Sequence, residues 1–364
     1  MIEKFKSNAE AIATADKYLY GNHARMPIVM DRGEGCWVWD LDNNKYLDFV
    51  GGIAVNGLGH HHPAIVEALD RAKDMMHCSN YYYNEPAVQV CKLICENSCF
   101  EKVLFANSGA EANEGQIKLA RKYAVDHGHP ERYVVISMLK SFHGRTLATA
   151  TATGQEIVHN PKWFSPLPEG FRYAEFNNLE SVKEQMGDDV CAILTEPVQG
   201  EGGVMALDPD YVQAVRKLCD EKDLVLIVDE VQTGVGRTGT FLCCEHYNLK
   251  PDIVTLAKGL GGGLPIGAVL LNEKTAEGMG PGSHGSTFGG NPVVCAGANV
   301  VVDRMDQSFL ANVSERAVQL RAGLAKLPMV KNLSGIGLMV GIEFFGGIQA
   351  ADVLAACREK GLLV

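Results

Sequence analysis

Residues 224–267 of the chain read LVLIVDEVQTGVGRTGTFLCCEHYNLKPDIVTLAKGLGGGLPIG. This stretch contains two short apolar runs, 224–228 and 253–257, whose length and β-branched residues predict two buried strands. Asp229 follows the first run directly, and Lys258 follows the second. Ligands of open α/β sheets bind at the carboxyl ends of the strands. We therefore expect a carboxylate and an amine together at the functional edge of one sheet.

An acid and a lysine at such an edge suit pyridoxal phosphate. This cofactor needs a lysine that bonds to its aldehyde and a carboxylate that keeps its pyridine nitrogen protonated. Gly259 and Gly261–Gly263 follow the lysine and favour a backbone that passes close to a ligand. Taken singly, most lysines are exposed surface charges, and an acid after a strand is often a helix cap. The acid, the lysine and the glycines together favour the cofactor.

Residues 234–239 match the G-x-G-x-x-G pattern of dinucleotide-binding loops. In those loops the first glycine follows the strand directly and the loop opens a helix. Here Asp229 and Glu230 lie between the strand and the glycines, and their charges would repel a pyrophosphate. We expect residues 234–239 to form a loop that binds no dinucleotide.

The composition is that of an acidic globular enzyme. The 364 residues are 46% hydrophobic, and 44 acidic against 33 basic residues give a net charge of −11. Such a charge argues against a nucleic-acid or anionic-membrane partner. The apolar runs are too short to span a bilayer, and the first ten residues, MIEKFKSNAE, lack the apolar core of a secretory signal. We therefore expect a cytoplasmic protein.

Two groups of side chains raise the question of a metal site. Cys91, Cys95 and Cys99 recur every four residues, which predicts one face of a helix. Apolar neighbours favour buried core thiols over metal ligands at these positions. The run 60–62 contains three histidines but lacks a matching cluster of carboxylates or thiols, so a loop that enters a helix is favoured. We expect no metal.

Strands and helices alternate along the middle of the chain, which predicts an α/β fold with a mostly parallel, doubly wound sheet. The predicted strands are 103–106, 133–136, 191–194, 224–228, 253–257 and 268–271, with helices over 110–126 and 209–220. A helical arm over 1–20, which includes NAEAIATADKYLY (8–20), and a hairpin over 37–49 are predicted before them. Helices over 292–306, 308–327 and 350–360 and a strand over 335–345 are predicted after them.

This pattern predicts two domains. Residues 51–294 form the large cofactor-binding domain, and residues 1–50 and 295–364 form a smaller α+β domain from both chain ends. Residues 362–364 begin what resembles a further strand. We expect the C-terminal part of the small domain to be incomplete.

Residues 103–113 predict a strand, a turn of small residues and a helix. Backbone amides of Ser108, Gly109 and Ala110 at the helix N-terminus suit a phosphate, although an ordinary serine cap fits equally well. In SFHGRT (141–146), Phe142 is placed to stack on a flat ring and Arg145 to bind a carboxylate. A core aromatic and a surface ion pair are the alternatives for these two residues.

The chain resembles the class III aminotransferases of the fold-type-I pyridoxal phosphate enzymes. The matching stretches are LDFVGGIAVNGLGHHHP (47–63), NSGAEANEGQIKLAR (107–121), SFHGRT (141–146), EPVQGEGG (196–203), DEVQTGVGRTG (229–239), LAKGLGGGLPIGAV (256–269) and GSHGSTFGGNP (282–292). The resemblance implies a mostly parallel seven-stranded sheet sandwiched by helices, pyridoxal phosphate as cofactor, and a homodimer with active sites at its interface.

The resemblance also implies roles around the ring of the cofactor. Lys258 bonds to the cofactor and moves the proton, and Asp229 pairs with the ring nitrogen. Phe142 covers one face of the ring and Val231 the other, while Gln232 reaches the phenolic oxygen.

Further roles at the phosphate and the substrate follow from the same resemblance. Gly109 and Ala110 hold the phosphate, and Thr287 contributes to it from the neighbouring subunit. Arg145 and Ser286 contact the substrate. Glu201 matches a glutamate that masks a C-terminal arginine when one of the two substrates enters.

Within this family the chain is most similar to the enzymes that act on N-acetylornithine. The expected reaction is a ping-pong transamination between N-acetylornithine and 2-oxoglutarate, which yields N-acetylglutamate semialdehyde and glutamate in arginine biosynthesis. Succinylornithine, ornithine and 4-aminobutyrate are the alternative amine donors. The C-terminal arginine has no counterpart here, so impaired turnover of glutamate, or a cofactor-binding form with reduced activity, is a further expectation.

Overall fold

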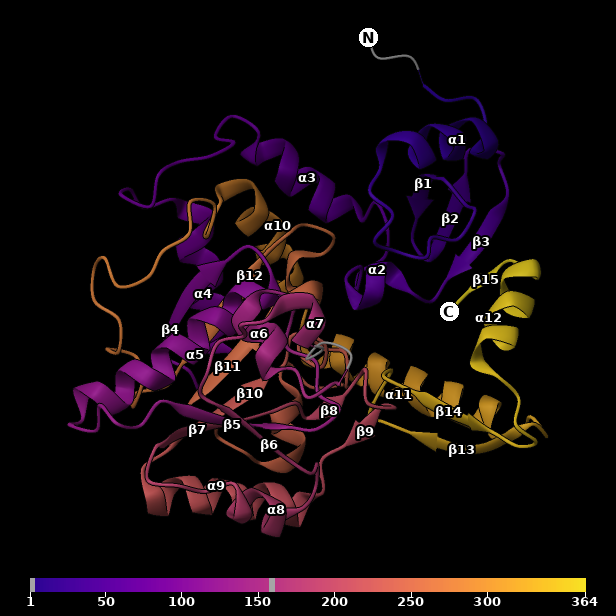
Figure 1. Cartoon of the computed structure of the whole chain (residues 1–364). Helices are drawn as coiled ribbons and strands as arrows, with labels where there is room; N and C mark the ends of the chain where they lie inside the picture. Colours follow the sequence, from indigo (N-terminus) through magenta and orange to yellow (C-terminus); the bar gives the residue numbers. More distant parts are fainter. Residues whose placement is uncertain (1–3, 157–160) are drawn as a thin grey trace.

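The computed structural model describes residues 4–156 and 161–364, and its centre is a seven-stranded sheet (Figure 1). Within the described residues, β12 runs antiparallel to both of its neighbours and the other six strands share one direction. The predicted α/β fold with a mostly parallel sheet is confirmed. The strands in spatial order are β4 (Lys102–Ala106), β12 (Gly267–Leu271), β11 (Ile253–Leu256), β10 (Val225–Asp229), β7 (Val190–Thr195), β5 (Val134–Met138) and β6 (Phe171–Ala174).

The central strands are apolar on both faces because helices cover both sides of the sheet. Every residue of β5, β7, β10, β11 and β12 is buried. Along β10, Leu226 belongs to one hydrophobic cluster and Ile227 to another, as expected for side chains that alternate across a sheet. Helix α9 (Pro209–Lys222) supplies Val212 and Val215 to the first cluster, and α5 (Gly109–Asp126) supplies Ile117 to the second.

Local sequence signals set where the main helices begin. The Ser108 hydroxyl caps α5 by accepting from the amide of Glu111 (3.2 Å), and Asp208 caps α9 ahead of Pro209. Asn291 caps α10 (Pro292–Asp303) in the same way. This last helix ends three residues before its predicted end at 306. Shorter helices complete the covering layers, namely α6 (Leu147–Ala152), α7 (Pro161–Phe164), α8 (Leu179–Glu184) and the 3₁₀ helices η1 (Cys243–Tyr247) and η2 (Lys258–Gly261).

Helix α4 (Glu85–Glu96) contains Cys91 and Cys95 but not Cys99, which lies exposed beyond the end of the helix. The prediction of one helical face with three cysteines is therefore wrong for Cys99, because the helix terminates at Asn97. All eleven cysteines are free. Among the described residues, no group of three or more His, Cys, Asp or Glu side chains is arranged to hold a metal, and no helix has the length and apolarity needed to cross a membrane.

Both ends of the chain meet in a second, four-stranded sheet (Figure 1). Its order is β1 (Met30–Glu34), β2 (Trp37–Asp40), β3 (Lys45–Asp48) and β15 (Leu362–Leu363), and β15 pairs parallel to β3. The predicted hairpin over 37–49 and the strand that begins at 362 are confirmed. The helices not yet given are α1 (Asn8–Tyr18), α2 (Gly51–Ala54), α3 (Pro63–Ala72), α11 (Gln307–Leu324) and α12 (Ala350–Glu359), of which α12 packs against β15.

The predicted strand over 335–345 is wrong in its first half. Two antiparallel strands occupy this region, β13 (Val330–Ser334) and β14 (Gly341–Phe344), and a turn joins them. Gly335 and Gly337 have φ values of +86° and +58°, a backbone region that breaks a strand and favours glycine. A two-stranded ladder of β8 (Val198–Gln199) and β9 (Met205–Ala206) lies at the edge of the main sheet.

The division into two domains stays a proposal, and α10 bears on where the division falls. This helix packs against α3, α4 and η2, all of which lie within the predicted large domain. We therefore propose that the boundary follows α10 instead of preceding it. The four-stranded sheet, α11, the β13–β14 hairpin and α12 then form the smaller domain.

Candidate active site

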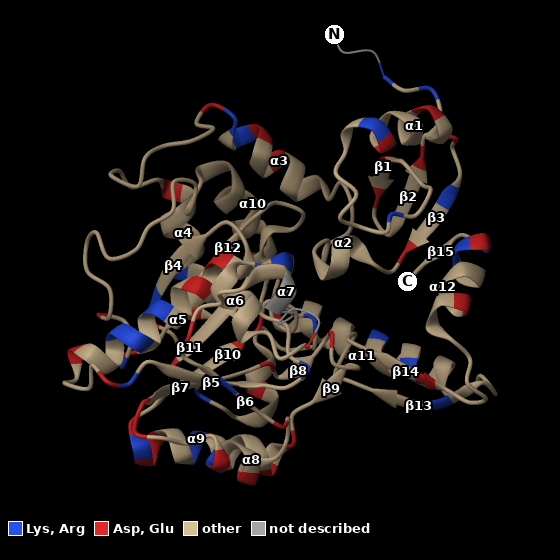
Figure 2. Cartoon of the chain, viewed as in Figure 1, with Lys and Arg blue, Asp and Glu red and all other residues tan. Residues whose placement is uncertain are grey.

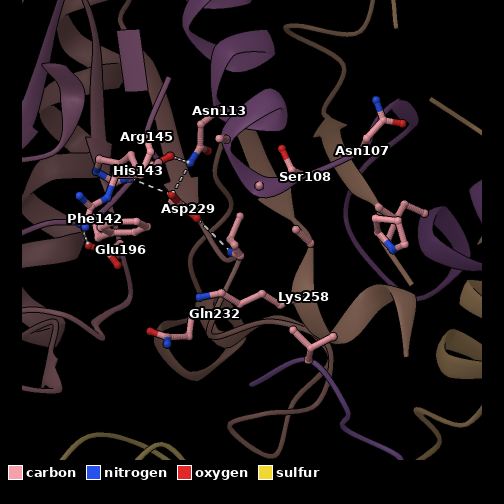
Figure 3. Close-up of a pocket in the computed structure, with 18 of the residues that line it drawn as sticks. Asn107, Ser108, Asn113, Phe142, His143, Arg145, Glu196, Asp229, Gln232 and Lys258 are labelled. Carbon is pink, nitrogen blue, oxygen red and sulfur yellow. Dashed lines mark hydrogen bonds and ion pairs between the residues drawn. The ribbon is translucent and has the colours of Figure 1, made fainter. Parts of the chain in front are cut away.

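The carboxyl ends of the parallel strands meet at a cavity of about 520 Å³ (Figure 3). Strand β10 ends at Asp229, β11 ends two residues before Lys258, and β4 leads into the turn before α5. Ten of the predicted site residues line this cavity, namely Ser108, Gly109, Ala110, Phe142, Arg145, Glu201, Asp229, Val231, Gln232 and Lys258. Residues from five separate stretches of the sequence are thus brought together.

Ser286 and Thr287 do not line the cavity of this chain. The Ser286 hydroxyl accepts a hydrogen bond from the side-chain amide of Asn107 (2.7 Å), and Asn107 itself lines the cavity. Ser286 is half-buried and contacts a residue of the cavity wall, and Thr287 is exposed on the surface. The roles predicted for these two residues stay predictions.

The carboxylate of Asp229 is buried and receives three hydrogen bonds. Its Oδ2 accepts from Nδ2 of Asn113 (2.7 Å) and pairs with Nδ1 of His143 (2.8 Å). Its Oδ1 accepts from the backbone amide of Val231 (3.0 Å). An ionised carboxylate offers about four acceptor positions, so Asp229, which lines the cavity, keeps capacity for one more donor.

Lys258 lies in the same cavity, close enough to Asp229 for their charges to interact (Figure 3). Burial lowers the pKa of its amine, and the positive charge of Arg237 lowers it further. The carboxylates of Asp229, Glu196 and Glu201 oppose this shift of the pKa. The backbone of Lys258 has φ of +41°, a strained conformation for a residue with a side chain, and such strain is concentrated at functional sites.

The turn before α5 forms a cradle for an anion. Gly109 and Ala110 begin the helix at the cavity, and amides at a helix N-terminus attract negative charge. A Cβ atom on Gly109 would lie 2.7 Å from Val231, and one on Gly267 would lie 2.2 Å from the carbonyl oxygen of Ser108. Side chains at these two positions would displace the turn, so only glycine leaves the cradle open.

Phe142 and Val231 line the same cavity as the cradle and Lys258. The backbone amide of Phe142 donates to Oε2 of Glu196 (3.0 Å), which anchors the aromatic residue at the cavity. The Arg145 guanidinium lies 5.3 Å from the centroid of the Phe142 ring. Both residues therefore lie on the same wall of the cavity.

The position of the Gln232 side chain requires a glycine at residue 200. A Cβ atom on Gly200 would lie 1.6 Å from Oε1 of Gln232, so any larger residue at 200 would force Gln232 out of its place. Gly200 belongs to the same EPVQGEGG stretch that supplies Glu201 to the cavity.

Three further residues of the site, Asn113, His143 and Glu196, had no role in the sequence-based prediction. Asn113 and His143 stand within the matching stretches 107–121 and 141–146, but only the folded chain shows that both contact Asp229. Glu196 follows the end of β7, so the rule that located Asp229 also applied to it. Burial, aided by the negative charge of Asp229, raises the pKa of Glu196 well above its ordinary value.

Comparison with known proteins places this geometry in a family. The family model for class III aminotransferases matches residues 18–364. The chain belongs to the class III aminotransferases. It is 51% identical to an acetylornithine aminotransferase from Caldanaerobacter subterraneus subsp. tengcongensis, over 96% of the chain and 89% of that protein. It is 49% identical to one from Haemophilus ducreyi, over 95% and 88%.

Solved aminotransferases share the fold. The ornithine aminotransferase of Toxoplasma gondii has a TM-score of 0.92 at 34% identity, over 99% of this chain and 87% of that one. Pyridoxal phosphate partly occupies the active site of that protein. The N-acetylornithine aminotransferase of Stenotrophomonas maltophilia has a TM-score of 0.80 at 37% identity, over 97% and 89%. The expected fold-type-I architecture is confirmed.

The cofactor of this aminotransferase is pyridoxal phosphate, and the cavity fits it. The helix N-terminus at Gly109 and Ala110 suits the phosphate, and the glycine cradle leaves the space that a phosphate requires. The buried carboxylate of Asp229 suits a protonated ring nitrogen, and the amine of Lys258 suits the aldehyde. The individual contacts of these residues with the cofactor stay proposals.

The lowered pKa of Lys258 predicts how the cofactor-free protein reacts with an amine-modifying reagent. The rate of Lys258 modification should level off at a pH below the ordinary lysine value of 10.5, because the neutral amine forms at lower pH. Peptide mapping of protein labelled at a series of pH values measures this. In Asp229→Asn, which lacks an opposing negative charge, the levelling pH should fall further. Levelling at or above 10.5 in the unsubstituted protein would contradict the account.

Proposed function

We propose that this aminotransferase transfers the amino group of N-acetylornithine to 2-oxoglutarate, with N-acetylglutamate semialdehyde and glutamate as products. The observation that carries the proposal is the name shared by relatives that are 51% and 49% identical over nearly the whole chain. The Asp229–Lys258 arrangement supports the reaction type. The eleven free cysteines support the proposal that the protein works in the reducing cytoplasm.

The residues of the chain act on the proton and on charge. When bound, pyridoxal phosphate withdraws electrons from the amine-bearing carbon and carries the amino group between the two substrates. Lys258 Nζ takes the proton from that carbon and delivers it to C4′, the aldehyde carbon of the cofactor. Its lowered pKa supports this role because a larger share of the amine is neutral near pH 7. Asp229 holds the proton on the ring nitrogen.

Arg145 and Glu201 support recognition of the two substrates. The guanidinium of Arg145, beside Phe142 at the cavity wall, offers two parallel donors to a substrate carboxylate. Glu201 lines the same cavity, and its negative charge opposes the entry of a second carboxylate at its position. We propose that this pair of charges orients the long amine donor with its terminal amine towards Lys258.

Turnover of competing amines tests the proposed substrate. With 2-oxoglutarate as acceptor, kcat/KM for N-acetylornithine should exceed that for ornithine and 4-aminobutyrate by at least about tenfold, since a site built for a polar acyl group leaves its partners unpaired with donors that lack it. N-Succinylornithine is the matched control, because it keeps the acyl amide. A preference for free ornithine would overturn the substrate.

Ornithine is the second candidate donor. The T. gondii ornithine aminotransferase has the higher TM-score of the two solved structures described above, although the S. maltophilia N-acetylornithine enzyme has the higher identity. The assay above decides between them.

We propose that the protein is a homodimer and that two paired loops, residues 75–84 and 278–291, lie at the interface. Neither loop contains a Lys, Arg, Asp or Glu, and both are uncharged in Figure 2. Tyr81 and Tyr83 are 94% and 98% exposed in the single chain, and Phe288 is also exposed. An uncharged surface rich in exposed aromatic side chains is typical of a protein interface.

Hydrogen bonds hold the paired loops together. Asn84 Nδ2 donates to the carbonyl oxygen of Gly290 (3.0 Å), and Asn291 Nδ2 donates to that of Met76 (2.8 Å). The rings of His77 and Phe288 lie 5.2 Å apart. Thr287 lies on this surface and away from the cavity of its own chain, which supports the proposal that it serves the neighbouring subunit.

Mixing two defective variants, assayed at a cofactor concentration too low to load Thr287→Asp, tests the shared site. Lys258→Ala should be inactive, and Thr287→Asp should bind the cofactor at least about tenfold more weakly because its charge repels the phosphate. After the two are unfolded and refolded together, activity should appear, because mixed dimers contain one site with both native residues. Each variant refolded alone is the control. Native size with no recovered activity would overturn the contribution of Thr287 across the interface.

A further inference from the structure

Asn113 lines the active-site cavity, and all of its hydrogen-bonding positions are in use. It lies on α5 and is 1% exposed. Its Nδ2 donates to Oδ2 of Asp229 (2.7 Å) and to the carbonyl oxygen of His143 (2.7 Å). Its Oδ1 accepts from Nε2 of Gln116 (2.7 Å) and from the hydroxyl of Thr255 (2.9 Å). Figure 3 shows Asn113 and His143 directed at Asp229 from different sides.

These contacts determine which way the Asn113 amide faces. A carboxylate and a backbone carbonyl accept hydrogen bonds and donate none, so the NH₂ group must face Asp229 and His143. The carbonyl oxygen of the amide must then face the donors on Gln116 and Thr255. Rotation of the side chain would break four buried hydrogen bonds at once, and each unsatisfied group would carry a desolvation cost.

Asn113 also joins the three elements that surround the cofactor. Helix α5 begins at the phosphate cradle, one turn before Asn113. Asp229 is the last residue of β10, and Thr255 is its direct partner in β11, three residues before Lys258. One side chain therefore ties the phosphate cradle to the strand of the acid and to the strand of the lysine.

We propose that Asn113, braced by Thr255 and Gln116, is the positioning residue that orients the Asp229 carboxylate towards the ring nitrogen of the cofactor. The inference rests on the role proposed for Asp229. With Oδ2 held by Asn113 and His143, the carboxylate plane is fixed, and the free acceptor position on the cavity side has a defined direction. If the hydrogen bonds from Thr255 and Gln116 to Asn113 are lost, the Asp229 carboxylate can rotate. It then stabilises the proton on the ring nitrogen of the cofactor less well.

The surroundings of Asn113 make a purely structural role a weaker explanation. Its neighbours on the same helix, Ala112, Ile117 and Ala120, attach α5 to the sheet through apolar contacts. These apolar residues are sufficient to pack α5 on the sheet, so Asn113 is not needed for that purpose. A buried polar network costs desolvation energy. This one leaves Oε1 of Gln116 without a hydrogen-bond partner among the described residues, yet it holds the Asp229 carboxylate at the cavity.

Thr255 provides the test because it braces Asn113 without lining the cavity. Thr255→Val keeps the shape and removes the hydroxyl, whereas Thr255→Ser keeps the hydroxyl. In the holoenzyme without substrate, the pH midpoint of the bound cofactor's visible absorbance should shift by at least about 0.5 pH unit in Thr255→Val. Cofactor affinity should fall about threefold to tenfold. Thr255→Ser should match the unsubstituted protein in both.

Asn113→Ala provides the second measurement, with an expected loss of cofactor affinity of about tenfold to a hundredfold, since a hydrogen bond to a charged group is lost. If this variant does not fold, Thr255→Val still decides. Unchanged absorbance titration and affinity in Thr255→Val with a lowered melting temperature would overturn the proposal, and so would equal shifts in the valine and serine variants. Asp229→Asn separates the two proposals, since an unchanged absorbance titration and cofactor affinity in that variant would refute the role of Asp229 itself.

Discussion

The buried carboxylate of Asp229 is the constraint around which the site is built. A charge at the end of a fully buried strand is tolerated only if nearby donors replace the water that it loses. Asn113, His143 and the Val231 amide supply those donors from three different segments of the chain. Each donor belongs to a segment whose position is set by its packing on the sheet. The position of α5, the course of residues 141–146 and the turn after β10 are therefore linked through a single carboxylate.

Close backbone approach is the second constraint on the site. The cradle at Gly109 and the start of β12 at Gly267 leave no room for a Cβ atom, and Gly200 makes room for Gln232. At Lys258, by contrast, a residue with a side chain adopts a conformation that glycine would adopt more easily. The chain accepts this strain at Lys258 because the reaction needs an amine there. The glycines thus keep the cavity open for the cofactor, whereas backbone strain occurs at Lys258, the residue that reacts.

Much of the fold and part of the site could be predicted because they depend on local signals. Asp229 and Lys258 follow apolar runs, and Ser108 precedes a helix, so their positions at the sheet edge follow from neighbouring residues alone. The contacts of Asn113 could not be predicted in this way, because they depend on which helix covers which strand. The same limit applies to β4, which pairs with β12 more than 160 residues later in the sequence. Glu196 could have been predicted, because it follows the end of β7 just as Asp229 ends β10, and ligands bind at the carboxyl ends of such strands.

Covalent trapping tests the central claim most directly. Protein supplied with pyridoxal phosphate is reduced with borohydride, digested, and mapped by mass spectrometry. The account predicts one modified lysine, Lys258, and loss of the label in Lys258→Ala. Label on a different lysine, or no label on folded protein saturated with the cofactor, would contradict it.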